Sequence, residues 1–146
     1  MRKLFYAIGA AICLATSNLA SAACANQNVY SSGANVPTSG SATVYGPVAV
    51  GCYGGMLTFK FEDFSGNYPT SKIRHLIERY DQTYIGTYQW NIVYQTTTQS
   101  VRSFTIQYPV LTTGVYRYRI VNIGTSVIRN WGMEGKVPLY NIPSYY

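Results

Sequence analysis

The sequence predicts an all-β fold, a sandwich of two packed antiparallel sheets with about seven strands. From residue 41 onward Tyr, Val, Thr, Ile and Phe dominate the chain, and these residues favour strands. Turn residues recur roughly every ten positions, and apolar and polar residues alternate between them. Together these patterns are typical of short strands joined by tight turns.

Residues 1–22 are predicted to be a cleaved signal peptide, and the protein is therefore expected to be secreted. Arg2 and Lys3 precede a short apolar run, and an Ala-Ser-Ala pattern follows at the cleavage point. The apolar run is too short to span a bilayer, and no later run is long enough for a transmembrane helix. A lipoprotein would carry its lipid on Cys24, but Ser21 occupies the position where a bacterial lipobox has Leu or a similar residue.

Two cysteines remain after cleavage, Cys24 and Cys52, and in a secreted chain they predict one disulfide. Closing this loop would stabilise the fold by roughly 3 to 4 kcal/mol in the chain-entropy model. The disulfide would attach residues 23–40, a Gly/Ser/Asn-rich segment expected to be a loop or loosely held leader, to a single domain of residues 41–146. Two cysteines and one histidine are too few ligands for a metal site, and no cofactor is expected.

Removing Arg2 and Lys3 leaves nine basic residues against five acidic ones, a formal net charge of +4. This excess could favour anionic partners such as acidic polysaccharides or a membrane surface, or it could serve solubility alone. There is no Lys/Arg-rich run, so nucleic acid is not an expected partner.

The first strands follow from the alternation. Residues 42–53 read as an edge strand that bends at Gly46 and Pro47, because proline cannot donate to a sheet. Residues 56–64 alternate regularly between large apolar and polar side chains. Residues 71–81 are ambiguous: they fit a short helix capped by Ser71 or a strand, and the surrounding Tyr and Thr residues favour the strand.

Three further strands are predicted in residues 87–95, 100–108 and 115–122, and a last one lies within residues 126–137. In the first of these, Tyr88, Trp90, Ile92 and Tyr94 share one face and Trp90 is expected in the core. The opposite, polar face carries Gln89 and Asn91. The strand at 115–122 directs tyrosines to one face and arginines to the other.

The stretch from Leu111 through Gly114 to Tyr116 resembles the tyrosine corner of immunoglobulin-like and fibronectin-type sandwiches. In such corners the tyrosine hydroxyl bonds back across the turn that joins two strands. Both cysteines precede Trp90, so the antibody pattern of two cysteines flanking a core tryptophan is absent. The resemblance therefore implies an architecture and not kinship.

Catalytic patterns are scarce, and an enzyme is not expected. His75 is the one histidine, and no nucleophile-elbow pattern accompanies it. Glu62 and Asp63 are adjacent, so their side chains would diverge on a strand instead of facing each other across a cleft.

Binding is the better hypothesis, because 15 tyrosines exceed what a core of this size can bury with partners for their hydroxyl groups. The chain is predicted to be a secreted, non-catalytic binding domain that recognises a carbohydrate or a protein at a cell surface. If the strands at 87–95, 115–122 and 126–137 are neighbours, one exposed face carries the candidate binding residues Gln89, Asn91, Arg117, Arg119, Arg129 and Trp131.

Other interpretations stay open. Outward polar residues are normal on a half-exposed strand, and the arginines could protect a sheet from edge pairing. A structural subunit that self-associates by strand addition, through the leader or the tyrosine-rich residues 140–146, is the main alternative. A small secreted toxin or inhibitor is a third.

Overall fold

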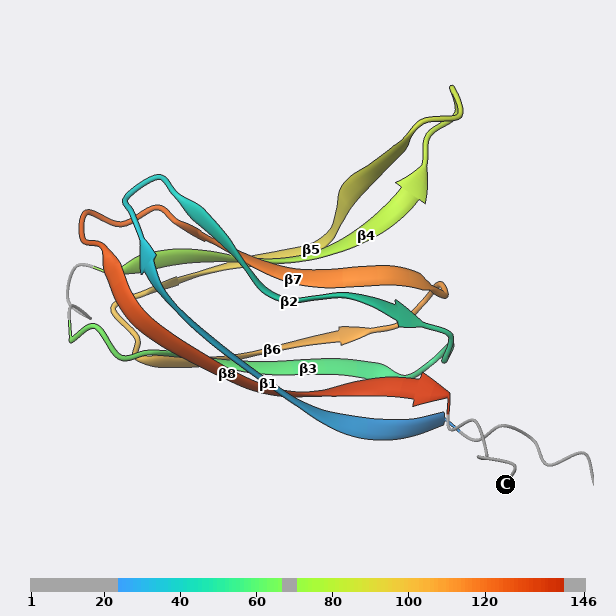
Figure 1. Ribbon diagram of the computed structural model, residues 1–146, viewed down its shortest axis with the longest axis horizontal. Helices are drawn as coiled ribbons and strands as arrows, with labels where there is room; N and C mark the ends of the chain where they lie inside the picture. The colour runs from blue at the N-terminus through green and yellow to red at the C-terminus, as the bar shows by residue number, and fades with distance from the viewer. Residues whose placement is uncertain (1–23, 67–70, 141–146) are drawn as a thin grey trace, which may run out of the picture.

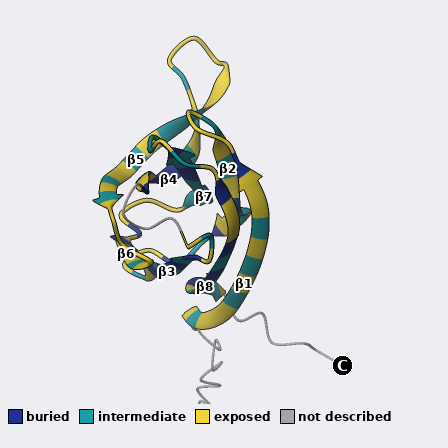
Figure 2. Cartoon of the chain, turned by 90° about the vertical axis from the view of Figure 1, so that its left-hand side faces the viewer, coloured by how far each residue is buried: buried dark blue, intermediate teal, exposed yellow. Residues whose placement is uncertain are grey.

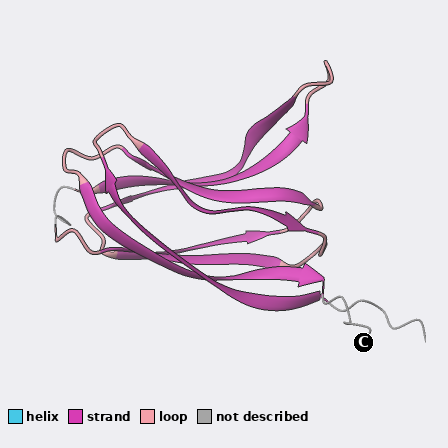
Figure 3. Cartoon of the chain, viewed as in Figure 1, coloured by secondary structure: helices cyan, strands magenta, loops and turns pink. Residues whose placement is uncertain are grey.

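The computed structural model describes residues 24–66 and 71–140, and the prediction of a two-sheet antiparallel sandwich is confirmed (Figures 1 and 3). The described residues contain no helix, and thus none that could cross a membrane. The predicted signal peptide lies outside them. The eight strands are β1 (Cys24–Val36), β2 (Ser41–Val50), β3 (Met56–Asp63), β4 (Lys72–Gln82), β5 (Tyr88–Gln99), β6 (Ser103–Pro109), β7 (Gly114–Asn122) and β8 (Ile128–Tyr140).

The strands form two four-stranded sheets (Figure 1). Sheet 1 has the order β1-β8-β3-β6 and sheet 2 the order β2-β7-β4-β5, with every pair of neighbours antiparallel. β1 and β2 approach each other at one side of the sandwich. β5 and β6 are the edge strands of the opposite side, and each pairs with one neighbour only.

Side chains at alternate positions of the two sheets meet in the core. Phe59 of β3 stacks on Tyr118 of β7, with 5.1 Å between ring centroids. Inward and outward residues alternate along β3, β6 and β7 as the sequence predicted. Burying this apolar surface is the main source of stability in such a fold.

The prediction that residues 23–40 are a loop or loose leader is wrong, because β1 occupies most of them and adds an eighth strand. β1 pairs with β8 along its length, from Cys24 opposite Tyr140 to Val36 opposite Ile128. Its small residues allow a close approach to β8. A Cβ atom on Gly33 would lie 2.3 Å from the ring of Trp131, far inside van der Waals contact.

The predicted disulfide between Cys24 and Cys52 is present. It joins the first residue of β1 to Cys52, the buried residue of the turn between β2 and β3. β1 is therefore held both by its pairing with β8 and by a covalent bond.

Two further predictions about strands are confirmed. β2 is an edge strand whose pairing with β7 shifts register between Thr43 and Tyr45 and again between Tyr45 and Val48. The second shift spans Gly46 and Pro47, which are joined by a cis peptide bond. The ambiguous segment 71–81 is a strand, β4, and not a helix.

The turn before β7 has the expected tyrosine-corner arrangement. The hydroxyl group of Tyr116 donates a hydrogen bond to the carbonyl oxygen of Thr112 across the turn. Gly114 begins β7, and Leu111 is exposed in the turn itself. This hydrogen bond holds the turn that leads into β7, the strand that carries Arg117 and Arg119.

Candidate binding face

A β-bulge in β5 decides which of its side chains face outward. Ile77 of β4 lies opposite Tyr94, but the next residue, Glu78, lies opposite Ile92. Val93 is therefore an extra residue, and the alternation of sides reverses across it. Tyr94 faces the core side, where its ring approaches that of Tyr108.

On the far side of this bulge, Tyr88, Trp90 and Ile92 face outward, away from sheet 1. The prediction that Tyr88, Trp90, Ile92 and Tyr94 share one face is wrong for Tyr94, and Trp90 is not in the core. Trp90 is half-buried on the outer face of sheet 2, with the guanidinium carbon of Arg117 4.1 Å from its ring centroid.

The other tryptophan occupies the position expected of Trp90. Trp131 is 5% exposed, belongs to the core and stacks on Phe61 with 5.9 Å between ring centroids. Its pairing with Gly33 and Asp63 places it on the inward positions of sheet 1. The prediction that Trp131 lies on an exposed binding face is therefore wrong.

Gln89 and Asn91 are on the opposite side of β5 from Trp90, so they do not join the arginines of β7 as predicted. The amide of Gln89 donates to Asn91 at 2.9 Å, and Asn91 donates to Asp81 at 3.4 Å. Asp81 also accepts a 2.6 Å hydrogen bond from Arg79. The bond from Arg79 holds the pKa of Asp81 below its ordinary value, although partial burial acts against it.

Arg129 is also separated from the predicted face. It lies near the start of β8, in sheet 1, and its backbone N–H donates to the hydroxyl of Ser65 at 2.7 Å. Of the six predicted binding residues, Arg117 and Arg119 lie together on the outer face of sheet 2, and Gln89 and Asn91 lie together on its other side.

Those two arginines share a carboxylate that the sequence analysis did not single out. Glu78 of β4 is 2% exposed. It accepts a 2.5 Å hydrogen bond from Nε of Arg117, and it accepts bonds of 3.1 and 2.8 Å from Nε and Nη2 of Arg119. Burial would raise the pKa of Glu78, but the hydrogen bonds and positive charges of Arg119 and Arg117 outweigh it and hold that pKa below its ordinary value.

The distal part of the β4–β5 hairpin, residues 79–92, is called the aromatic arm below. Beyond Tyr80 the pairing of β4 with β7 ends, and the hairpin extends past the rest of the sandwich (Figure 1). In Figure 2 most of the arm is exposed and the rest is intermediate. The ring of Tyr80 lies between those of Tyr88 and Trp90, at centroid distances of 5.5 and 5.1 Å. At the tip, Tyr84 and Ile85 are fully or largely exposed. A row of aromatic rings thus leads from the solvent to Arg117.

The two outer faces of the sandwich differ in charge. On sheet 2 the outward positions of the four strands carry four basic residues and one acidic residue, a net charge of +3: Lys72, Arg74, Arg117 and Arg119 against Glu78. On sheet 1, Lys60 and Lys136 are balanced by Glu62 and Glu134, and the exposed Arg129 at the start of β8 leaves a net charge of +1. Most of the positive excess is therefore on the face that carries the arm.

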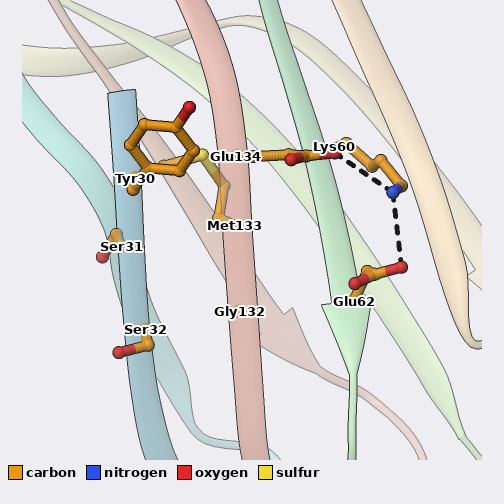
Figure 4. A pocket seen from close by; sticks show the side chains of 8 residues that line it. All are labelled: Tyr30, Ser31, Ser32, Lys60, Glu62, Gly132, Met133 and Glu134. Atoms are coloured by element: carbon orange, nitrogen blue, oxygen red, sulfur yellow. Dashed lines mark hydrogen bonds and ion pairs between the residues drawn. The ribbon is translucent and has the colours of Figure 1, made fainter. Parts of the chain in front are cut away.

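Sheet 1 has a shallow hollow on its outer face (Figure 4). It lies between Tyr30 on β1 and Lys60 on β3, above Gly132, which has no side chain to fill it. The ammonium group of Lys60 lies 3.4 Å from Glu62 and 3.1 Å from Glu134. One ammonium group between two carboxylates leaves the hollow with a net charge of −1, and exposed ion pairs of this kind are weak.

The histidine is far from solvent. His75 is fully buried, with Nδ1 2.6 Å from the Tyr118 hydroxyl and Nε2 3.0 Å from the Thr98 hydroxyl. Burial lowers its pKa to about 4. Among residues 24–66 and 71–140, no group of three His, Cys, Asp or Glu side chains could hold a metal ion.

No protein-family model matches this chain, and no curated protein is similar to it. The candidate binding face therefore rests on the geometry of this chain: the arm and the Arg117–Glu78–Arg119 cluster beside it. Glu78 could have been noticed in the sequence as an acidic residue directly after the apolar pair Leu76 and Ile77. Its partners could not, because they lie about 40 residues further along the chain.

Proposed function

We propose that this chain is a secreted, non-catalytic binding domain that recognises a surface carbohydrate through the aromatic arm. The observation that carries the proposal is the row of Tyr88, Tyr80 and Trp90, which ends at Arg117 on an outer sheet face. Aromatic rings bind the apolar faces of sugar rings, and the arginine donates hydrogen bonds to oxygen atoms of the ligand.

The shape of the surface favours an extended ligand. The hollows among the described residues are shallow and open, unlike the enclosed clefts that bury small molecules. A polymer lying across the outer face of sheet 2 would reach the arm and the arginines together. A polysaccharide fits such a surface better than a small metabolite does.

Two further observations support a role without catalysis. His75 is enclosed in the core, where no external substrate would reach it. The carboxylates of Glu78 and Asp81 are both held by arginines, which keeps them ionised and occupied. Neither arrangement is suited to general acid–base chemistry, which needs a titrating group in contact with the substrate.

The test is a glycan-binding screen with the oxidised chain from residue 23 onward, followed by titration of any glycan that binds. Tyr88→Ala is expected to weaken binding about tenfold, which corresponds to roughly 1.4 kcal/mol. Tyr30→Ala is the matched control, because Tyr30 is 71% exposed on the other sheet. Equal binding by the wild type and Tyr88→Ala, or equal loss in the two variants, would contradict a site on the arm.

A second candidate is a subunit that assembles by strand addition, and the free edge of β5 favours it. β5 pairs only with β4, and residues 82–101 contain no charged side chain that would discourage pairing with another strand. The predicted leader forms β1, which pairs with β8 on one side and is an edge strand of sheet 1 on the other. The tail beyond Tyr140 lies outside the described residues.

Light scattering with size-exclusion chromatography over a wide concentration range tests assembly. A subunit is expected to form oligomers that Thr97→Lys, a charge placed on the β5 edge, disrupts. A monomer at every concentration would contradict this candidate.

A further inference from the structure

The Arg117–Glu78–Arg119 cluster is not needed to fill space on the outer face of sheet 2. Leu76 occupies the preceding outward position of β4 and is equally buried, at 2% exposure, outside the core cluster. An aliphatic side chain is therefore accepted on this face at the same depth. Since buried ion pairs are often no more stabilising than apolar residues of similar size, the cluster calls for an explanation other than stability.

The carboxylate of Glu78 holds both guanidinium groups in place, but some N–H donors of each arginine make no bond to it. Arg117 contributes only Nε to Glu78, and Arg119 contributes Nε and Nη2. Within the described residues, no hydrogen bond occupies either Nη of Arg117 or Nη1 of Arg119. The two side chains are 22% and 27% exposed, so solvent reaches them.

Trp90 limits the freedom of the first arginine further, because the guanidinium of Arg117 lies over its ring at 4.1 Å. Two guanidinium groups are thus held in place before any ligand arrives, which lowers the entropy lost on binding. Guanidinium groups pair with oxyanions through parallel N–H···O bonds, and a fixed pair suits one oxyanion group better than a diffuse charge.

The positive charges around the two arginines also favour an anionic ligand. One carboxylate cannot neutralise two arginines, and Arg74 and Lys72 add positive charge on the same face of β4. The outer face of sheet 1 has no such excess. An anionic polymer is therefore attracted to the face that carries the arm.

We propose that Arg117 and Arg119 form an oxyanion subsite, and that the carbohydrate is acidic, with a carboxylate or sulfate group on a sugar whose neighbours lie on Tyr80 and Tyr88. This inference rests on the proposed function and adds the chemical class of the ligand. Glu78 is then a positioning residue, which orients the arginines and does not contact the ligand.

Calorimetric titration with four probes at fixed ionic strength tests the subsite. Polygalacturonate carries carboxylates, its methyl ester is uncharged, dextran sulfate carries sulfates and dextran is neutral. We expect at least one anionic polymer to bind ten times more tightly than its uncharged counterpart, and the pair that differs identifies the oxyanion.

Two variants separate a built site from general attraction. Arg119→Gln and Lys136→Gln each remove one positive charge, but Lys136 lies on sheet 1. The subsite predicts at least a tenfold loss for Arg119→Gln and less than a twofold loss for Lys136→Gln. Equal losses would overturn it. If Arg119→Gln does not fold, Arg119→Lys decides, since it keeps the charge but not the paired N–H donors, and unchanged affinity would overturn the subsite.

The outcomes distinguish the two proposals. Equal binding of charged and uncharged polymers, or a screen in which only neutral glycans bind through Tyr88, would overturn the oxyanion subsite and leave the carbohydrate-binding function standing. Binding of no carbohydrate at all would overturn both.

Discussion

At His75 a titratable imidazole lies inside the sandwich. The ring is enclosed by Phe61 and Phe104, with ring-centroid distances of 5.6 and 5.0 Å. Tyr118 and Thr98 occupy its two nitrogens, one hydroxyl at each. Because burial penalises the charged imidazolium form, the folded protein holds this histidine neutral, with a pKa of about 4.

This burial predicts a loss of stability in mild acid. The unfolded chain binds a proton near the ordinary His pKa of 6.5, while the folded chain does so only near 4. The free energy of unfolding is therefore highest above pH 6.5 and falls as the pH drops toward 4, by about 2 kcal/mol between pH 7 and pH 5. Urea denaturation at pH 7, 6 and 5 measures this loss.

His75→Gln is the comparison for that experiment, because glutamine keeps hydrogen-bonding capacity without titrating. It is expected to be less stable at pH 7 but to lose little more by pH 5. The same acid dependence in both proteins would assign the effect to other groups. Glu78 adds to the loss of stability only at lower pH. Its pKa in the folded state is below the ordinary carboxyl value, so the unfolded chain takes up a proton there before the folded chain does.

Among the elements, β1 and β8 depend on one close contact. Gly33 lies opposite Trp131, and a Cβ atom there would lie 2.3 Å from Cζ2 and 2.6 Å from Cε2 of the indole. The indole N–H is buried with no hydrogen-bond partner among the described residues. The ring is thus retained for its packing and not for a bond made by its nitrogen.

A double-mutant cycle tests that contact. Gly33→Ala is expected to cost about 2 kcal/mol of unfolding free energy, because the indole cannot move without disturbing Phe61. Trp131→Phe removes the clashing atoms, so Gly33→Ala in that background is expected to cost at least about 1 kcal/mol less. Denaturant titration of the four proteins measures the coupling, and strictly additive losses would contradict the clash.

Individual strands show where sequence reasoning succeeded and where it could not. β6 and β7 alternate without interruption, and their inward and outward residues were predicted. β1 was read as a leader because Ser, Gly, Ala and Asn are typical of loops. In β5 the alternation was extended through Val93, since no residue type announces a bulge, and this reversed the sides of Gln89, Asn91 and Trp90.

At the scale of the whole molecule, the residues that stabilise the fold and the residues of the candidate binding site lie in different parts. The core between the sheets contains most of the large buried side chains, and the aromatic arm extends beyond it (Figure 2). The disulfide, the tyrosine corner and the paired strands belong to the body. The candidate site combines the arm with the Arg117–Glu78–Arg119 cluster on the outer face of sheet 2. The pairing register of β4 with β7 brings these residues together, and composition alone does not reveal that register.

This division predicts that the tip of the arm can change without loss of stability. Replacing Tyr84 and Ile85 by serine is expected to alter the free energy of unfolding by less than about 0.5 kcal/mol, because both side chains are exposed. Phe59→Ala in the core is the contrasting variant, with an expected loss of about 3 to 5 kcal/mol. Thermal and urea denaturation measure both, and a loss above about 1.5 kcal/mol at the tip would mean that the arm packs on the body.

The strand order of sheet 1 also sets the order in which the molecule can be completed. β8, the last strand of the sequence, lies between β1 and β3, so neither of these can acquire that neighbour until residues 128–140 have been synthesised. Until then β1 lacks its partner strand, and besides the backbone that leads into β2, the bond between Cys24 and Cys52 links it to the rest of the chain. A chain that stops before residue 128 therefore cannot be a smaller version of this fold: it lacks the strand that joins its beginning to its middle.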